Sequence, residues 1–456
     1  MKMTFSDLNF IFRLLPIFLI IYYCVTPTFR KWVLLLGSLG FYYLNEPRLI
    51  LVLLIMNLIN WLFALLLKKT NSSVILAITI LLNVSTLAFY KVGASYAKDI
   101  IVPLGLSYYI FKMISYQVDL YKGKIESVSI IGMMNYFFLF PQIIAGPISR
   151  YEYIQDNMMW LPQGVKDRSS IFLVLHQIED GLKYFCCGLF MKIIIADHLA
   201  VFWSDLKVIG YESLSTPLAW LGAYAYTLNL FFDFWGYSLM AAGVGVMLGF
   251  PFIQNFNQPY GANSISEFYR RWHSTLGFWF RDYVYFPLGG NRKGKFKSIF
   301  NLIVVWLLTG AWHGLTPNFF IWSMGICLII IFEKFILGRF PKIFAVLGRV
   351  NVLVIIPVTW VIFAIHSTDN LVLYLLRMFP FIDISVAVNR QDIFYYLRDY
   401  WAYLLLGLIL AIPCVSGFYK RHKDNLFVVL IIFAMFWISI FSLSNSAGNP
   451  FMYLRF

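Results

Sequence analysis

Two histidines lie in strongly apolar and aromatic stretches of the chain: His313 in Trp306-Leu-Leu-Thr-Gly-Ala-Trp-His-Gly314, and His273 in Glu267-Phe-Tyr-Arg-Arg-Trp-His273. An ionisable side chain at membrane depth is costly, and by default it indicates a transport path, a proton relay or a reaction centre. Histidine has the ordinary pKa nearest neutrality, so it can take up and return a proton. We therefore predict that both histidines are catalytic, with a histidine that only packs between helices as the structural alternative.

Charged and polar side chains near these histidines are candidates for binding a substrate. Arg270 and Arg271 could hold the phosphates of a nucleotide thioester or the acidic face of a carrier protein. The structural alternative is a pair of arginines that set membrane orientation and reach toward the bilayer surface. The full set of tentative substrate-binding residues is Arg270, Arg271, Asn255, Trp312 and Gln142.

Other polar residues interrupt apolar runs. Gln142 and the following Gly146-Pro147 predict a helix break that lines a cavity, because irregular backbone at membrane depth survives only where protein or water satisfies it. Asp233 is expected to pair with an arginine or to line a cavity. The sequence has no metal-ligand spacing and no glycine-rich nucleotide loop, so we expect no metal and no tightly bound cofactor.

The elements that must position these residues begin in the least apolar stretch, 251–298. Ser264-Ile-Ser-Glu267 is a capping box that predicts the start of a helix, and Pro287 should follow its end. Within that helix four residues would fall on one face, at i, i+3, i+7 and i+11. They are Arg270, His273, Gly277 and Arg281. Such a polar stripe on an aromatic helix predicts an interfacial or re-entrant element beside a wet cavity.

The composition of the whole chain places it in the membrane. Hydrophobic residues make up 60%, charged residues 13%, and the mean hydropathy is +0.74, which excludes an ordinary soluble domain. A helix needs about 20 apolar residues to cross a bilayer. The sequence offers runs at 8–24, 32–44, 49–67, 73–90, 99–118, 129–147, 170–195, 215–250, 298–313, 315–337, 350–366, 399–417 and 425–444. We predict one membrane-embedded domain over 1–456, with 251–314 as its catalytic region.

The net charge of +14 is concentrated in short loops between these runs, where Lys and Arg set orientation. This distribution argues against a nucleic-acid partner. The basic loops at 292–297 and 339–349 are predicted to be cytoplasmic, which places both termini outside.

Several ordered motifs together resemble one family. They are Pro103-Leu-Gly-Leu-Ser-Tyr-Tyr-Ile-Phe111, Phe140-Pro-Gln-Ile-Ile-Ala-Gly-Pro147, Phe232-Asp-Phe-Trp-Gly-Tyr-Ser238, Asn255-Phe-Asn-Gln-Pro-Tyr260, Arg270-Arg-Trp-His273, Arg281-Asp-Tyr-Val-Tyr-Phe-Pro-Leu-Gly-Gly-Asn-Arg292 and Leu308-Thr-Gly-Ala-Trp-His-Gly314. Their order closely resembles the membrane-bound O-acyltransferase (MBOAT) family, in its bacterial alginate O-acetylation-like branch.

The resemblance implies a bundle of about 11–13 transmembrane and re-entrant helices around a central tunnel, in the cytoplasmic membrane. It implies transfer of an acetyl group from a cytoplasmic thioester, either acetyl-CoA or an acyl carrier protein, toward hydroxyls of an exported or cell-surface polysaccharide. It also implies an extracytoplasmic SGNH-type acetyltransferase as a partner. By the same resemblance, His313 is the catalytic histidine and His273 the second candidate.

The chemistry of acyl transfer fits these residue types. The attacking hydroxyl needs a base and the developing oxyanion needs hydrogen-bond donors. We predict that His313 is the base, that Trp312 walls the site, and that Thr309 or backbone N–H groups of the flanking glycines are donors. A transient acyl-histidine is an alternative mechanism. D-alanyl transfer to teichoic acid and a non-enzymatic transporter are the alternative functions.

Overall fold

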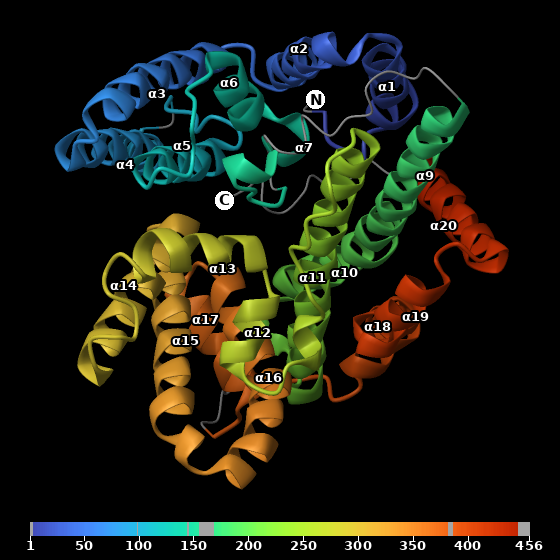
Figure 1. Ribbon diagram of the computed structural model, residues 1–456. Coiled ribbons are helices and arrows are strands. Elements are labelled where there is room, and N and C mark those ends of the chain that lie inside the picture. The colour runs from blue at the N-terminus through green and yellow to red at the C-terminus, as the bar shows by residue number, and fades with distance from the viewer. Residues whose placement is uncertain (1–2, 98, 144–145, 155–167, 382–385, 446–456) are drawn as a thin grey trace. The chain divides into compact units, whose positions relative to one another are not determined.

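In a computed structural model of the chain, the described residues are 3–97, 99–143, 146–154, 168–381 and 386–445. All regular secondary structure among these residues is helical (Figure 1). Nine helical stretches in this described part are long and apolar enough to cross a bilayer. The predicted class, an all-α polytopic membrane protein, is confirmed.

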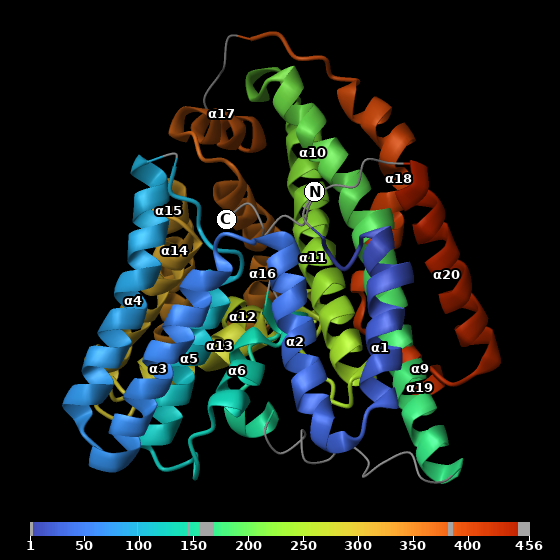
Figure 2. The ribbon, with the colours of Figure 1, turned by 90° about the horizontal axis from the view of Figure 1, so that it is seen from above.

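The contacts group the chain into two compact units, of which the first comprises Met1–Gly188 and Tyr237–Gln254. Its elements are a π-helical turn at Phe10–Leu14, α1 (Leu15–Cys24), α2 (Pro27–Asn45), α3 (Ile50–Thr70), α4 (Ser73–Tyr96), α5 (Leu106–Tyr121), α6 (Ile130–Phe138), α7 (Phe140–Ile143), most of α9 (Arg168–Phe190) and the end of α11 (Thr216–Met247). Figures 1 and 2 show α3, α4 and α5 side by side.

The second unit comprises Leu189–Gly236 and Asn255–Phe456. Its elements are a π-helical segment at Met191–Ala196, α10 (Asp197–Ile209), a 3-10 turn at Tyr211–Ser213, the start of α11, a 3-10 turn at Pro259–Gly261, α12 (Ile265–Arg271), α13 (Ser274–Phe280), a π-helical segment at Arg281–Tyr285, α14 (Lys295–His313), α15 (Pro317–Phe335), a 3-10 turn at Leu337–Arg339, α16 (Pro341–Ala364), α17 (Thr368–Met378), α18 (Asp392–Ala411), α19 (Pro413–His422) and α20 (Leu426–Asn445). The prediction of a single domain stays a prediction.

Most apolar runs form the helices expected of them. The run at 215–250 forms the unbroken 32-residue helix α11. The run at 129–147 is instead interrupted between α6 and α7, where Leu139 leaves the helical conformation. Proline is the first residue of α2, α15, α16 and α19, where its missing N–H costs nothing.

The second unit holds the helices that matter most for the candidate site. Figures 1 and 2 show α14, α15 and α16 next to one another. Glycines allow α14 to approach α15 closely, because a Cβ atom at Gly310 would lie 2.4 Å from Ser323 Oγ and one at Gly314 would lie 2.4 Å from the Phe319 ring. Small residues spaced four apart are a common means of close helix contact in membranes.

The start of α12 is fixed from two sides. Ser264 Oγ accepts a hydrogen bond from Glu267 N at 3.0 Å, which confirms the predicted cap. Glu333 of α15 is almost fully buried, and its carboxylate accepts hydrogen bonds from Ile265 N, Ser266 N and Ser266 Oγ at 2.8–2.9 Å. A carboxylate at a helix N-terminus is stabilised by the helix dipole. This contact attaches α12 to α15.

The helix predicted to run from Ser264 toward Pro287 is broken, so the single-helix prediction is wrong. Helix α12 ends at Arg271, α13 begins at Ser274, and His273 between them has a left-handed backbone with φ of +43°. The four residues predicted to share one helix face therefore belong to separate short elements.

An ion cluster joins the π-helical segment Met191–Ala196 to the first residue of α10 and to α11. The Lys192 ammonium lies 2.8 Å from Asp233 Oδ1 and 2.5 Å from Asp197 Oδ1. Asp233 thus has a cationic partner, as predicted, but the partner is a lysine rather than an arginine.

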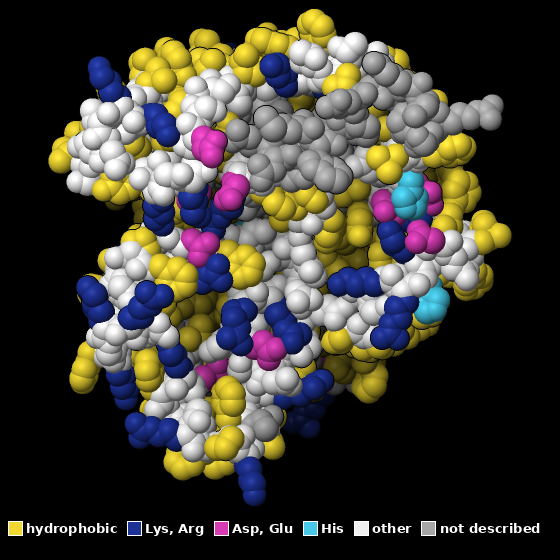
Figure 3. Space-filling view, in the orientation of Figure 1, with side chains coloured by type: hydrophobic (Ala, Val, Ile, Leu, Met, Phe, Trp, Pro, Cys, Tyr) yellow, Lys and Arg dark blue, Asp and Glu magenta, His cyan; other side chains and the backbone are white. Residues whose placement is uncertain are grey.

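Basic side chains mark part of the surface of the second unit. Figure 3 shows Lys and Arg over the region formed by α12 to α16. Among them, the side chains of Arg292, Lys293 and Lys295 are exposed just before or at the start of α14. Exposed loop cations of this kind fit an orientation signal.

Candidate active site

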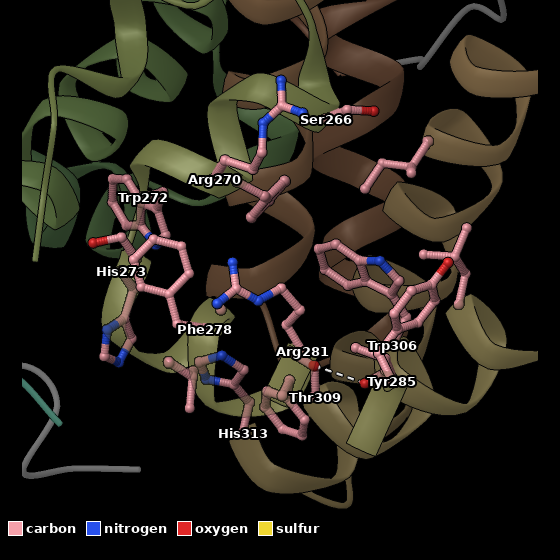
Figure 4. A pocket seen from close by; sticks show the side chains of 18 of the residues that line it. Ser266, Arg270, Trp272, His273, Phe278, Arg281, Tyr285, Trp306, Thr309 and His313 are labelled. Atoms are coloured by element: carbon pink, nitrogen blue, oxygen red, sulfur yellow. Dashed lines mark hydrogen bonds between the residues drawn. The ribbon is translucent and has the colours of Figure 1, made fainter. Parts of the chain in front are cut away.

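A cavity of about 330 Å³ lies within the second unit, and both candidate histidines line it. Cavities of this order accommodate small-molecule ligands. Figure 4 shows Arg270, His273, Arg281 and His313 around this cavity. Large apolar side chains supply much of the remaining wall, including Trp272, Trp306, Trp322, Trp360, Leu302 and Ile330.

His273 is held in a defined orientation at the break between α12 and α13. Its side chain is buried, and Nδ1 lies 2.9 Å from Asn255 Oδ1. The edge of the imidazole meets Phe234, with ring centroids 4.7 Å apart and an interplanar angle of 82°. A left-handed backbone at a residue other than glycine costs about 1–3 kcal/mol and is often found at functional sites. Burial lowers the pKa of His273 to about 3, so the ring is neutral at neutral pH.

His313 is the last residue of α14 and is packed in an aromatic box. Its ring centroid lies 5.0 Å from that of Trp322 and 5.0 Å from that of Phe363, both edge to face. Asn318 Nδ2 donates a hydrogen bond to the carbonyl oxygen of Phe363 at 3.0 Å, which fixes the end of α16 beside the histidine. The rings packed around His313 are aromatic and apolar, as a water-excluding reaction site requires.

Trp312 lies close to both histidines. Its ring centroid is 4.5 Å from that of His313 and 6.3 Å from that of His273. The two histidines line one cavity, and the indole of Trp312 lies near both of them. Of the donors predicted for an oxyanion, Thr309 Oγ1 donates to Val305 O at 2.8 Å and Gly314 N donates to Gly310 O at 3.1 Å, so both hydrogens are used within α14.

The two predicted binding arginines differ in their surroundings. Arg270 lines the cavity. Arg271 forms an ion pair with Glu267, with Nη2 and Oε1 2.5 Å apart, and its proposed contact with a substrate stays a prediction. The N–H of Asn263 and the guanidinium of Arg271 lower the pKa of Glu267. A second cation of the cavity wall is Arg281, which is half exposed and also bonds Asp282.

The last two candidates lie in different units. Asn255 is buried behind His273 in the second unit. Gln142 belongs to the first unit, where its Oε1 accepts a hydrogen bond from Ser149 Oγ at 2.7 Å. The predicted break around Gln142 is present, since α7 ends at Ile143 and 146–150 are not helical. Its role in substrate binding stays a prediction.

Sequence reasoning missed several residues that shape the site. Phe234, Trp322 and Phe363 pack directly on the histidine rings, yet each lies within an apolar helix and looks like ordinary core. Glu333 was a detectable signal, because an acidic residue within an apolar run needs a buried partner.

Comparisons with known proteins agree with one another. A model of the membrane-bound O-acyltransferase family matches residues 2–376. A probable alginate O-acetylase of Pseudomonas putida is 31% identical, with all of this chain and all of that protein covered. A peptidoglycan O-acetyltransferase of Helicobacter pylori is 31% identical over 95% of this chain and 86% of its own length. A teichoic acid D-alanyltransferase of Bacillus subtilis is 32% identical, but over 48% of this chain and 56% of its own length.

Proposed function

This chain belongs to the membrane-bound O-acyltransferase family, and from that premise we propose that it moves an acetyl group from a cytoplasmic thioester toward a hydroxyl of an exported or cell-surface polysaccharide. One observation carries the proposal: two buried histidines from separate elements line one cavity that also includes two arginines. Buried ionisable residues that converge on a cavity are characteristic of catalytic sites.

In the proposed reaction His313 is the general base. The hydroxyl oxygen attacks the thioester carbonyl carbon while the histidine takes the hydroxyl proton. The tetrahedral intermediate then collapses, the carbon–sulfur bond breaks, and His313 returns its proton to the leaving thiolate. The aromatic box of Trp322 and Phe363 holds the His313 ring in place and keeps water from competing with the hydroxyl.

The thioester donor is proposed to enter past the arginines. Arg270 and Arg281 line the cavity and are exposed, which suits the phosphate groups of coenzyme A or of the prosthetic group of a carrier protein. The tryptophans that line the same cavity, Trp272, Trp306, Trp322 and Trp360, suit the uncharged arm that follows the phosphate.

Acetyl is the preferred cargo over D-alanine. The alginate relative aligns with the whole chain, whereas the D-alanyl relative aligns with about half of it. We also propose a cytoplasmic-membrane location and an extracytoplasmic SGNH-type acetyltransferase as a partner of this chain. Pull-down of that class of protein with the tagged chain would test the partnership.

The decisive experiment replaces His313 by Ala and by Gln in cells that lack the native chain. Acetyl esters on surface glycans, released by mild base, should fall to the level of the deletion strain, while membrane abundance stays normal. Membranes incubated with labelled acetyl thioester should likewise lose transfer. His422→Ala is the matched control, because His422 is exposed at the end of α19 and contacts Phe418 of the same helix, through its carbonyl oxygen and its stacked ring. Esters that persist in both His313 variants would refute the assignment.

A further inference from the structure

Asn255 makes an unusual number of contacts with the segment that carries His273. Its backbone carbonyl accepts hydrogen bonds from Ser274 N at 2.8 Å and Ser274 Oγ at 3.2 Å. Its side-chain oxygen lies 2.8 Å from Thr275 Oγ1, 3.4 Å from Thr275 N and 2.9 Å from His273 Nδ1. One asparagine thus fixes three consecutive residues.

These contacts decide which nitrogen of His273 carries the proton. The backbone N–H of Thr275 can only donate, so the Asn255 atom facing it must be the amide oxygen. That oxygen can only accept, so His273 Nδ1 must carry the hydrogen and donate it. In a neutral imidazole, Nε2 is then a bare acceptor.

The remaining ring nitrogen is available for a reaction partner. Nε2 of His273 is buried and has no hydrogen-bond partner among the residues that the structure describes. A buried acceptor without a partner costs about 1–3 kcal/mol, and such atoms in native structures call for a functional explanation. The left-handed backbone of His273 adds a second local cost at the same residue.

We propose that Asn255 is a positioning residue whose side-chain oxygen holds His273 in the Nδ1-protonated tautomer, so that Nε2 is the acceptor for a substrate hydroxyl in the acyl-transfer site. The role of Nε2 rests on the proposed function, whereas the tautomer does not. In this tautomer Nε2 of His273 receives a hydrogen bond from a substrate hydroxyl beside the attacking one and so orients the substrate, while the attacking hydroxyl gives its own proton to His313. It has no hydrogen on Nε2 to give to an oxyanion.

An amide suits this position better than a carboxylate. A carboxylate at 255 would accept the same hydrogen but would also stabilise the imidazolium, which has no bare nitrogen. The charged and titratable groups that line the same cavity are Tyr269, Arg270, Arg281, Tyr285 and His313. Burial opposes protonation of the His273 ring.

The tautomer can be measured without any substrate. The chain has six histidines, so ¹⁵N-histidine-labelled protein in lipid bilayers gives few ring signals, and loss of one set in His273→Gln assigns His273. We expect a protonated Nδ1 and a bare Nε2 in the wild type at neutral pH. An Nε2-protonated ring, or fast exchange between tautomers, would overturn the proposal.

Variants of Asn255 then test whether this residue fixes the tautomer of His273. Asn255→Leu keeps the side-chain size but removes the acceptor, so the ring should populate both tautomers and acetyl transfer should fall about 10- to 100-fold. Asn255→Asp keeps the acceptor and should restore the tautomer, with the acidic limb of the pH–rate profile moved to higher pH. An unchanged tautomer in Asn255→Leu would show that Asn255 does not hold it.

Thr275→Val is the matched control. It removes one hydrogen bond to the same oxygen but leaves that to His273, so both tautomer and pH profile should match the wild type. The two proposals can fail separately. If Asn255→Leu scrambles the tautomer while transfer is unaffected, the role of Nε2 in the reaction is wrong and the positioning of His273 stands. If His313 variants retain transfer, the proposed function fails whatever the tautomer.

Discussion

The second unit contains two buried polar sites, the ion cluster of Lys192 and the side chain of His273, and they differ in whether their polar atoms have partners. At Lys192 the ammonium contacts the carboxylates of both Asp197 and Asp233, so each carboxylate has a cationic partner. At His273 one ring nitrogen is bonded to Asn255 and the other has no partner among the described residues. A paired cluster is what a structural role requires, whereas an unpaired buried acceptor lowers stability and is suited to a ligand. Burial alone does not distinguish a structural polar group from one that binds a ligand. The distinguishing feature is whether every polar atom of the buried group has a partner.

The largest effect should come from breaking the paired cluster. Lys192→Met would leave the buried carboxylate of Asp233 and the partly buried one of Asp197 without their cation, and removing one partner of a buried ion pair typically costs about 3–5 kcal/mol. We expect a marked fall in the temperature at which the detergent-solubilised protein loses its monodisperse peak. Combining it with Asp197→Asn and Asp233→Asn should recover much of the loss. A single variant as stable as the wild type would mean that the ion cluster is not structural.

The unpaired site should respond in the opposite way. His273→Asn removes the ring but keeps a residue that tolerates a left-handed backbone, so stability should change by no more than about 1 kcal/mol. Acetyl transfer should fall about 100-fold because the orienting acceptor is lost. Thermal stability and transfer are to be measured on the same preparation. A stability loss as large as that of Lys192→Met would erase the distinction between the two sites.

A third variant tests whether the close contact between α14 and α15 near His313 is needed for stability and transfer. Gly310→Ala would place a Cβ atom 2.4 Å from Ser323 Oγ, and overpacking of this kind costs about 1–3 kcal/mol. Adding Ser323→Ala removes the obstructing hydroxyl and should recover part of the stability and of the transfer. If the double variant is no better than the single one, the clash with Ser323 is not the cause.

The smallest effect concerns the ion pair beside the cavity. The pKa of Glu267 is lowered from 4.5, so its charged form stabilises the fold above that pH, and this contribution is lost as the pH falls through the lowered value. Glu267→Gln should cost about 0.5–1 kcal/mol at neutral pH, since the pair is partly exposed. The wild type and the variant should converge in acid. A difference that persists at low pH would point to packing rather than charge.

The membrane class, most helices and the Ser264 cap could be predicted because they depend on local composition and short spacings. Both His273 and His313 were predicted to be catalytic, and the structure places both of them on one cavity. The break at His273 was not predictable from the pattern, because the capping box and the periodicity both favoured a continuous helix. The backbone there is set by contacts with Asn255, 18 positions away in the sequence.

The sequence also did not predict which residues pair over long distances in the chain. Glu333 reaches the start of α12 across 68 positions, and Lys192 reaches Asp233 from another helix. An isolated charge in an apolar run predicts that a partner exists, but many distant residues could supply it. Helix packing determines which residue becomes the partner of a buried charge, and this packing cannot be read from a single sequence.

The glycines of α14 also bear on how the cavity can open. Because Gly310 and Gly314 bring α14 into direct contact with α15, the end of α14 that carries His313 has little room to move without α15. The opposite wall is looser, since Gly277, Phe278 and Arg281 are exposed and the π-helical segment Arg281–Tyr285 has none of its residues buried. We therefore expect substrate-driven motion in this π-helical segment, while His313 at the end of α14 stays in place and the moving segment closes toward it.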